Sequence, residues 1–268
     1  MADIDPQGKI FADSNQLVQK QFSTQADGYK TSAVHARGQD LGWLVGQAAL
    51  TGQERILDVG TGAGHTAFAF AQASREVVGL DLTARMVHNA TELASQRGLT
   101  NVSFIVGDAV SMPFPNSYFD VATCRYAAHH FVDPEGAIQE ISRVLKPHGL
   151  VLMVDHIAPL DPLLDHYINH VDRMRDPSHV REWTADEWHQ RFQKYDISSR
   201  ITYEWDLHLE VAWWLIQAGV PEDRRVEIKR YFKSADANTR HTFNIQFDDQ
   251  GEPLSFALKC ALFNGRKT

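Results

Sequence analysis

The chain has 268 residues, of which 43% are hydrophobic and 22% are charged, and its formal net charge is −8. This length suits one α/β domain with a modest insertion, and no apolar run is long enough for a membrane span. A negatively charged chain without a run of lysine or arginine would repel a phosphate backbone, which excludes nucleic acid as the expected partner.

The start of the chain is polar and acidic, unlike a secretory signal, so we expect a cytoplasmic protein. Helical patterns in residues 1–50 predict an N-terminal helical cap over the mouth of a sheet. Cys124 and Cys260 lie far apart in apolar runs, which is typical of buried thiols rather than of a disulfide or a metal cluster. We therefore expect no metal site.

Residues 53–156 alternate short apolar runs with helical patterns, which is typical of βαβ units that feed a parallel sheet. The five expected strands are residues 54–59, 76–80, 102–106, 119–124 and 150–155. The expected helices between them are residues 66–73, 83–97 and 134–145. Ligands of such sheets bind at the carboxyl ends of the strands, so we expect the site in the loops that follow them.

Residues 157–195 are rich in His, Asp and Pro, and we expect a small helical lid there, with a helix at 185–193. Alternation in residues 197–211 and the apolar run 254–266 predict a sixth and a seventh strand. The prediction is a single domain, residues 1–268. In it, the core 53–156 and the C-terminal part 196–268 form a seven-stranded, mostly parallel sheet with helices on both faces.

The strongest local motif is ILDVGTGAG at residues 56–64, a strand that runs into a glycine-rich turn and opens a helix. Gly60, Gly62 and Gly64 allow a tight turn and close approach to a ligand, because a Cβ would clash or forbid the required φ values. Asp81 follows Gly60 by 21 residues and ends the second strand, where a carboxylate can accept hydrogen bonds from a ribose diol. The alternative is an N-cap for the next helix. The pattern favours a nucleotide-like cofactor.

Two residues, His65 and Asp58, distinguish a dinucleotide such as NAD from S-adenosylmethionine (SAM). A dinucleotide motif would have a third glycine where this chain has His65. Asp58, in the glycine-rich segment, would repel a pyrophosphate but suits the α-ammonium group of SAM. Asp108 follows the third strand and either accepts a hydrogen bond from the adenine amine or is a turn aspartate. Together they favour SAM.

Three segments, ILDVGTGAGHTAFAFA, VVGLDLTARMV and residues 107–155, resemble class I SAM-dependent methyltransferases of the ubiquinone and menaquinone biosynthesis type (methyltransferase type 11). The resemblance covers residues 54–156 and implies a Rossmann-like fold, SAM as cofactor and S-adenosylhomocysteine as product. It does not specify the acceptor, because this group of enzymes methylates quinones, polyketides, alkaloids and sterols.

The resemblance also assigns roles to individual residues. It implies that the methionine end of SAM is held by Asp58, Gly60, Gly62 and Gly64, the ribose and the adenine edge by Asp81 and Leu82, and the adenine by Asp108 and Ala109. Arg125 would line the cofactor channel. An N-terminal FxxxAxxY-like segment, here Phe22, Ala26 and Tyr29, would cover the cofactor, with Tyr29 near the methionine carboxylate.

Methyl transfer from a sulfonium mainly requires that acceptor, methyl and sulfur are aligned and that water is kept out. An oxygen or carbon-acid acceptor must also lose a proton, and His129, His130 and His156 follow the fourth and fifth strands as candidate bases. The chain has 13 histidines, so a structural role is the alternative for each.

The sequence therefore predicts a SAM-dependent methyltransferase that methylates O, C or N of a small, partly apolar metabolite. Two alternatives remain open: a SAM-binding protein without transferase activity, acting as a sensor or a repurposed catalyst, and an NAD-dependent oxidoreductase. No pattern in the chain predicts its oligomeric state.

Overall fold

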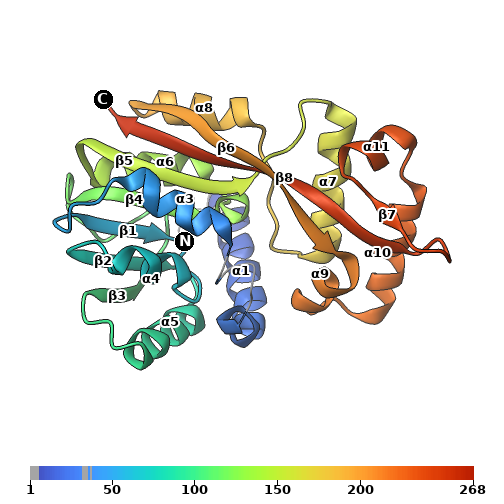
Figure 1. Cartoon of the computed structure of the whole chain (residues 1–268), viewed down its shortest axis with the longest axis horizontal. Helices are drawn as coiled ribbons and strands as arrows, with labels where there is room; N and C mark the ends of the chain where they lie inside the picture. Colours follow the sequence, from blue (N-terminus) through green and yellow to red (C-terminus); the bar gives the residue numbers. More distant parts are fainter. Residues whose placement is uncertain (1–5, 32–35, 37) are drawn as a thin grey trace.

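The computed structural model describes residues 6–31, 36 and 38–268, and it places a central sheet beside a smaller second lobe (Figure 1). The strand order is β3-β2-β1-β4-β5-β8-β6, with β7 paired to β8 outside this path. Strands β1 to β5 pair in parallel, and β8 pairs antiparallel with both β5 and β6. The strands are β1 (Arg55–Val59), β2 (Glu76–Asp81), β3 (Val102–Val106), β4 (Phe119–Arg125), β5 (Leu145–His156), β6 (Ile197–Glu210), β7 (Gln246–Phe247) and β8 (Pro253–Lys267).

The predicted α/β fold with a seven-stranded, mostly parallel sheet is confirmed, and the two-residue strand β7 is an addition to it. The fifth strand begins at Leu145 rather than at residue 150. Its pairing with β4 is irregular there, because Phe119 pairs with Leu145 whereas Val121 pairs with Leu150. This irregularity accommodates Pro147 and Gly149, which had indicated a break before the strand.

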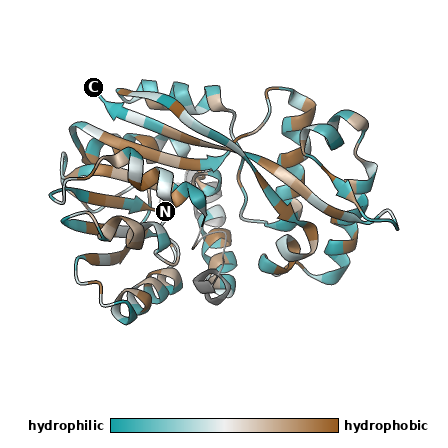
Figure 2. Cartoon of the chain, in the orientation of Figure 1, coloured by the Kyte–Doolittle hydropathy of each residue, from teal (hydrophilic) through white to brown (hydrophobic). Residues whose placement is uncertain are grey.

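Alternate residues of the central strands pack into separate cores on the two faces of the sheet, as the strand period of two requires. On one face, Leu57 belongs to a core with Ile138 of α6 (Pro134–Val144). On the other, Ile56 packs with Phe70 of α4 (His65–Ala71) and with α3 (Gln39–Ala48). Figure 2 shows hydrophobic residues along the strands, where both faces are covered.

The second lobe has its own hydrophobic core, with Trp214, Phe232 and Phe256 buried in it. It is built from α7 (Pro162–Arg175), α9 (Val211–Gln217), α10 (Glu222–Ser234) and α11 (Ala237–Thr242). The long strands β6 and β8, of 14 and 15 residues, extend from the main sheet into this lobe (Figure 1). The two cores are therefore joined by continuous strands rather than by a linker.

The segment predicted as one helical lid, residues 157–195, contributes to both cores. Helix α7 lies in the second lobe, whereas α8 (Ala185–Lys194) packs on the main sheet beside β6. The reason is the face of α8: Trp188 and Phe192 are four residues apart, share one side of the helix and are both buried in the main core.

Helix α1 (Pro6–Thr31) lies between the main sheet and the second lobe (Figure 1). It packs against α5 (Ala84–Gln96). Gln19 donates from Nε2 to the carbonyl of Leu82 after β2, at 3.1 Å. Gln21 donates to the carbonyl of Ala218 after α9, at 3.0 Å. Helix α1 thus contacts both the carboxyl end of β2 in the main sheet and the end of α9 in the second lobe.

Both cysteines are buried and free, as predicted. Within the described residues, no helix is both long enough and apolar enough to cross a membrane.

Candidate active site

The glycine-rich turn joins β1 to α4 at the carboxyl edge of the sheet. The backbone N–H groups of Gly60 and Thr61 both donate to the carbonyl of Leu80 on the neighbouring strand, at 2.8 and 3.0 Å. Gly60 has φ +68°, and a Cβ there would stand 2.5 Å from the Cβ of Ala127. Only glycine fits this position without a shift of backbone, so the turn stays flush against the loop after β4.

Asp58 lies beneath this turn rather than in the wall of the cavity described below. It is 1% exposed and accepts hydrogen bonds from the hydroxyls of Thr61, at 2.6 Å, and Thr123, at 2.8 Å. Burial raises the pKa of Asp58 to about 6 even though both hydroxyls stabilise its charged form. The carboxylate therefore fixes the turn from below.

Two further carboxylates lie at the ends of the next strands. Asp81 accepts hydrogen bonds from the backbone N–H groups of Gly62 and Thr83, each at 2.8 Å. Burial raises its pKa, although these hydrogen bonds oppose the shift. Asp108 accepts from the Asn15 side chain of α1 at 2.9 Å. Both residues face the same cavity.

A cavity of about 350 Å³ runs from the glycine-rich turn to the second lobe. Its wall includes residues from the loops after β1, β2, β3 and β4, from helix α1, and from the second lobe. Trp213 of α9 and Leu207 of β6 line the lobe side, and Phe22 of α1 lies over it. The cavity thus has a backbone-rich end at the sheet and an aromatic and aliphatic end at the lobe.

Arg125, at the end of β4, also lines the cavity although it is 7% exposed. Its guanidinium donates from Nε and Nη2 to the two carboxylate oxygens of Asp40 in α3, at 2.5 and 3.2 Å. The guanidinium also lies over the ring of Tyr126, 4.8 Å from its centroid. A two-point pair of this kind fixes the orientation of the arginine and compensates its buried charge.

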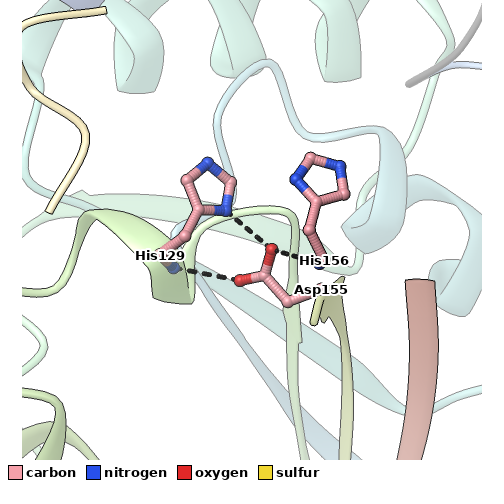
Figure 3. Close-up of side chains that lie close together, drawn as sticks. All are labelled: His129, Asp155 and His156. Carbon is pink, nitrogen blue, oxygen red and sulfur yellow. Dashed lines mark hydrogen bonds and ion pairs between the residues drawn. The ribbon is translucent and has the colours of Figure 1, made fainter. Parts of the chain in front are cut away.

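At the lobe end, His129 and Asp155 form a tightly bound pair (Figure 3). Nδ1 of His129 lies 2.6 Å from one carboxylate oxygen of Asp155, and the backbone N–H of His129 donates to the other at 3.0 Å. Burial opposes the charged imidazole, but the carboxylate of Asp155 outweighs it and raises the pKa of His129 to about 9. At neutral pH the pair is an imidazolium held by a carboxylate.

Two neighbouring histidines have the opposite character. Burial, together with the charge of His129, lowers the pKa of His130 and of His156 to about 4. Nδ1 of His130 lies 3.1 Å from the carbonyl of Ser178. Nδ1 of His156 lies 3.4 Å from Oε1 of Glu182. The lobe end of the cavity therefore contains one charged histidine flanked by two neutral ones.

His129, Asp155 and His156 bring possible ligand atoms within 4.8 Å of one another. Both oxygens of Asp155 already accept hydrogen bonds: Oδ1 from Nδ1 of His129 and from the backbone N–H of His156, the latter at 2.8 Å, and Oδ2 from the backbone N–H of His129. In Figure 3 the two rings stand on the same side of this carboxylate. We therefore interpret the group as a hydrogen-bonded histidine–aspartate pair with a second histidine beside it.

A family model described as "Methyltransferase domain" matches residues 50–205. The chain belongs to this methyltransferase family. It is 43% identical over 246 residues to the uncharacterised methyltransferase YcgJ of Bacillus subtilis, which covers 92% of this chain and 97% of that protein. It is also 31% identical over 157 residues to a demethylmenaquinone methyltransferase of Deinococcus radiodurans, which covers 56% of this chain and 65% of that protein.

Solved structures agree with the sequence matches. The crystal structure of YcgJ superposes with a TM-score of 0.84 and covers 85% of this chain and 98% of that one. A putative methyltransferase from Bacillus halodurans, 34% identical, superposes with a TM-score of 0.83 and covers 86% and 99%. The predicted membership of the methyltransferases related to ubiquinone and menaquinone biosynthesis is confirmed.

Most of the predicted site residues of this methyltransferase lie around one cavity. Those that line it are Gly60, Gly62, Asp81, Leu82, Asp108, Ala109, Arg125, His129, His130 and His156. Asp58 and Gly64 lie just behind its wall; Gly64 has φ +88° and is the N-cap residue before α4. The side chain of Tyr29 lies outside the described residues, so its predicted role stays a prediction.

Several residues of the site were not predicted as members of it. Asp40 lies 85 residues before its partner Arg125. Asp155 carries no local signal beyond its place at a strand end. Glu182 and Arg175 come from the segment without strand pattern. The nearest available signal is in RDPSHVRE (residues 175–182), where charged residues and histidine are dense in a stretch of low periodicity.

Proposed function

We propose that the chain is a SAM-dependent methyltransferase that methylates an ionisable hydroxyl, a phenol or an enol, of a small and partly apolar metabolite. The observation that carries this proposal is the single cavity that joins the glycine-rich turn to the His129–Asp155 pair. One end suits a nucleoside with an amino-acid tail, and the other suits an acceptor whose oxygen becomes negatively charged.

The residues at the sheet end fit SAM in shape and in charge. Gly62 lines the cavity, and no protein atom lies within 4 Å of the place where a Cβ would stand, so a ligand can lie against the backbone of the turn there. Asp81, Asp108 and Ala109 line this end of the cavity, and in this proposal Asp81 accepts hydrogen bonds from ribose hydroxyls while Asp108 and Ala109 bind adenine. Arg125 lines the channel, and Asp58 acts through Thr61 by holding the turn. When bound, SAM supplies an electrophilic methyl group on a positively charged sulfur.

The charge of His129 favours oxygen over nitrogen as the methylated atom. A phenolate or enolate loses its negative charge during transfer, so a neighbouring imidazolium stabilises the reactive form of the acceptor before reaction. An amine gains positive charge during transfer, and the same imidazolium would raise its barrier. Trp213, Leu207 and Phe22 supply the apolar surface for the rest of the acceptor.

The test is turnover of methyl-labelled SAM with size-matched phenols, enols and amines, with S-adenosylhomocysteine measured as the product. We expect label on the hydroxyl or enol acceptors. His129→Gln should lower kcat by about 100-fold or more, whereas His88→Gln, on the exposed side of α5, should not change it. Label on amines alone would contradict the acceptor assignment. Binding of SAM without turnover across the panel would favour the alternative of a SAM-binding protein.

A further inference from the structure

A buried pair of carboxyl groups lies behind the acceptor end of the cavity. Asp172 of α7 and Glu182, in the loop between α7 and α8, share a side-chain hydrogen bond. They are 6% and 1% exposed. Two carboxylates cannot hydrogen-bond to each other unless one carries a proton, so this pair holds one proton and one negative charge. A small cavity of about 30 Å³ opens between Asp172 and His156.

One polar atom of the Asp172–Glu182 pair has no hydrogen-bond partner. Oε1 of Glu182 is buried and makes no hydrogen bond. It lies 3.4 Å from Nδ1 of His156, whose ring also lines the main cavity. A buried carboxylate oxygen without a hydrogen bond is costly, and Nδ1 of His156 is the polar atom that lies beside it.

We propose that His156 and Glu182 form a proton relay that carries the proton of the acceptor hydroxyl into the Asp172–Glu182 carboxyl pair. The relay rests on the proposed function. Nε2 of His156 takes the proton as the acceptor O–H bond breaks, and the electron pair stays on the oxygen and forms the new bond to the methyl carbon. The proton on Nδ1 of His156 passes to Oε1 of Glu182. His156 remains neutral and changes only its tautomer.

This relay keeps the buried net charge constant. Methyl transfer removes the positive charge of the sulfonium from the cavity, and protonation of Glu182 removes one negative charge. A proton that stayed on an isolated histidine would instead leave a new positive charge beside the His129 imidazolium. Because uncompensated charge in a buried site is costly, the arrangement lowers the barrier without exchange of ions with solvent.

The groups that surround the relay have fixed charges near neutral pH, which leaves Glu182 as the one that responds. His129 and Asp155 form an ion pair, and Asp165 pairs with Arg181 at 2.7 Å. Burial raises the pKa of Tyr126 and of Cys260, so both stay neutral, and it also raises the pKa of Asp172 well above its usual range. Arg175 is a permanent cation. Burial raises the pKa of Glu182 to about 7, so it is ready to accept a proton and to release it later.

The pH profile tests the relay. In the full-length enzyme, kcat should rise with pH through about 7, as Glu182 becomes a carboxylate, and fall through about 9, as His129 loses its proton. Glu182→Gln should lower kcat by about 100-fold and remove the acidic limb, with the affinity for SAM unchanged. Glu135→Gln is the matched control, because Glu135 lies on α6 and pairs with Lys194, away from the cavity. Wild-type rate together with an unchanged acidic limb in Glu182→Gln would overturn the relay.

Two further measurements keep the test independent of folding and of the choice of acceptor. His156→Asn should reproduce the loss of kcat and of the acidic limb without a change in the KM for SAM. In ¹⁵N NMR spectra of the protein without acceptor, His156 should be neutral and protonated on Nδ1 at about pH 7. A proton on Nε2 would contradict the relay even if methyl transfer occurs. Failure of the wild type to turn over any acceptor would contradict the proposed function instead.

Discussion

The sheet end and the lobe end of the cavity are built in different ways. At the sheet end, the contacts come largely from backbone groups of Gly60, Thr61 and Gly62, held by strand geometry and by Asp58 below the turn. At the lobe end, they come from side chains of η1 (Ala128–His130), α7, α9 and β6 that are far apart in the sequence. The difference indicates that chain conformation defines the end proposed to bind SAM, whereas side-chain chemistry defines the end proposed to bind the acceptor.

If the two ends of the cavity are independent, a substitution at one end should not change binding at the other. The affinity for SAM measures the sheet end, and kcat together with the KM for the acceptor measures the lobe end. Three substitutions test this separation.

Asp155→Asn should have the largest effect, a fall in kcat of about 10²- to 10³-fold, because His129 loses the carboxylate that keeps it charged. Asparagine preserves the volume at this 1% exposed position. The pKa of His129 should fall from about 9, so the alkaline limb of the pH profile should move to lower pH. The control is Asp120→Asn, because Asp120 lies near the amino end of β4, away from the carboxyl ends of the strands that form the cavity. An equal loss of SAM affinity in Asp155→Asn would break the separation.

Gly60→Ala should reduce the affinity for SAM by roughly 10- to 100-fold, because the positive φ and the contact with Ala127 together store about 1 to 3 kcal/mol of strain. Gly52→Ala is the matched control: Gly52 has φ +90° and nothing within 4 Å of an added Cβ. Calorimetric titration with SAM checks both. At saturating SAM, the KM for the acceptor should be unchanged in Gly60→Ala, and a raised value would argue against independent ends.

Trp213→Ala should raise the KM for the acceptor by up to about 10-fold, through the loss of aromatic contact worth about 0.5 to 1.5 kcal/mol. The affinity for SAM should stay the same. Trp205→Ala is the control, since Trp205 packs edge-on against Trp43 of α3, with ring centroids 5.1 Å apart. If both variants change the KM equally, the effect is general destabilisation and Trp213 does not contact the acceptor.

The same comparison explains what the sequence predicts and what it does not. The sheet end of the cavity can be predicted from local sequence patterns. The glycine spacing predicts the turn, and the position of Asp81 after the second strand predicts its place in the cavity wall. The pair of Arg125 and Asp40 has no local signature, because the two residues meet only after α3 packs on the sheet.

The residues at the lobe end of the cavity could not be predicted from the sequence for a related reason. Residues 157–195 show no strand pattern, and periodicity alone does not say that α7 and α8 join different cores. His129 and His156 are visible as candidates among 13 histidines. Their opposite charge states depend on burial and on which carboxylate lies beside each ring. Burial and the choice of neighbouring carboxylate are both set by tertiary contacts between η1, β5 and the loop after α7.

The most direct test of SAM binding in this cavity is calorimetric titration of the purified protein with SAM, S-adenosylhomocysteine and NADH, together with Asp81→Ala and the control Asp120→Ala. Each charged hydrogen bond lost at Asp81 costs about 1.5 to 3 kcal/mol. We expect SAM and S-adenosylhomocysteine to bind, NADH not to bind, Asp81→Ala to weaken binding at least tenfold and Asp120→Ala to bind normally. Binding of NADH, or no binding of either sulfur ligand, would contradict the assignment of this cavity.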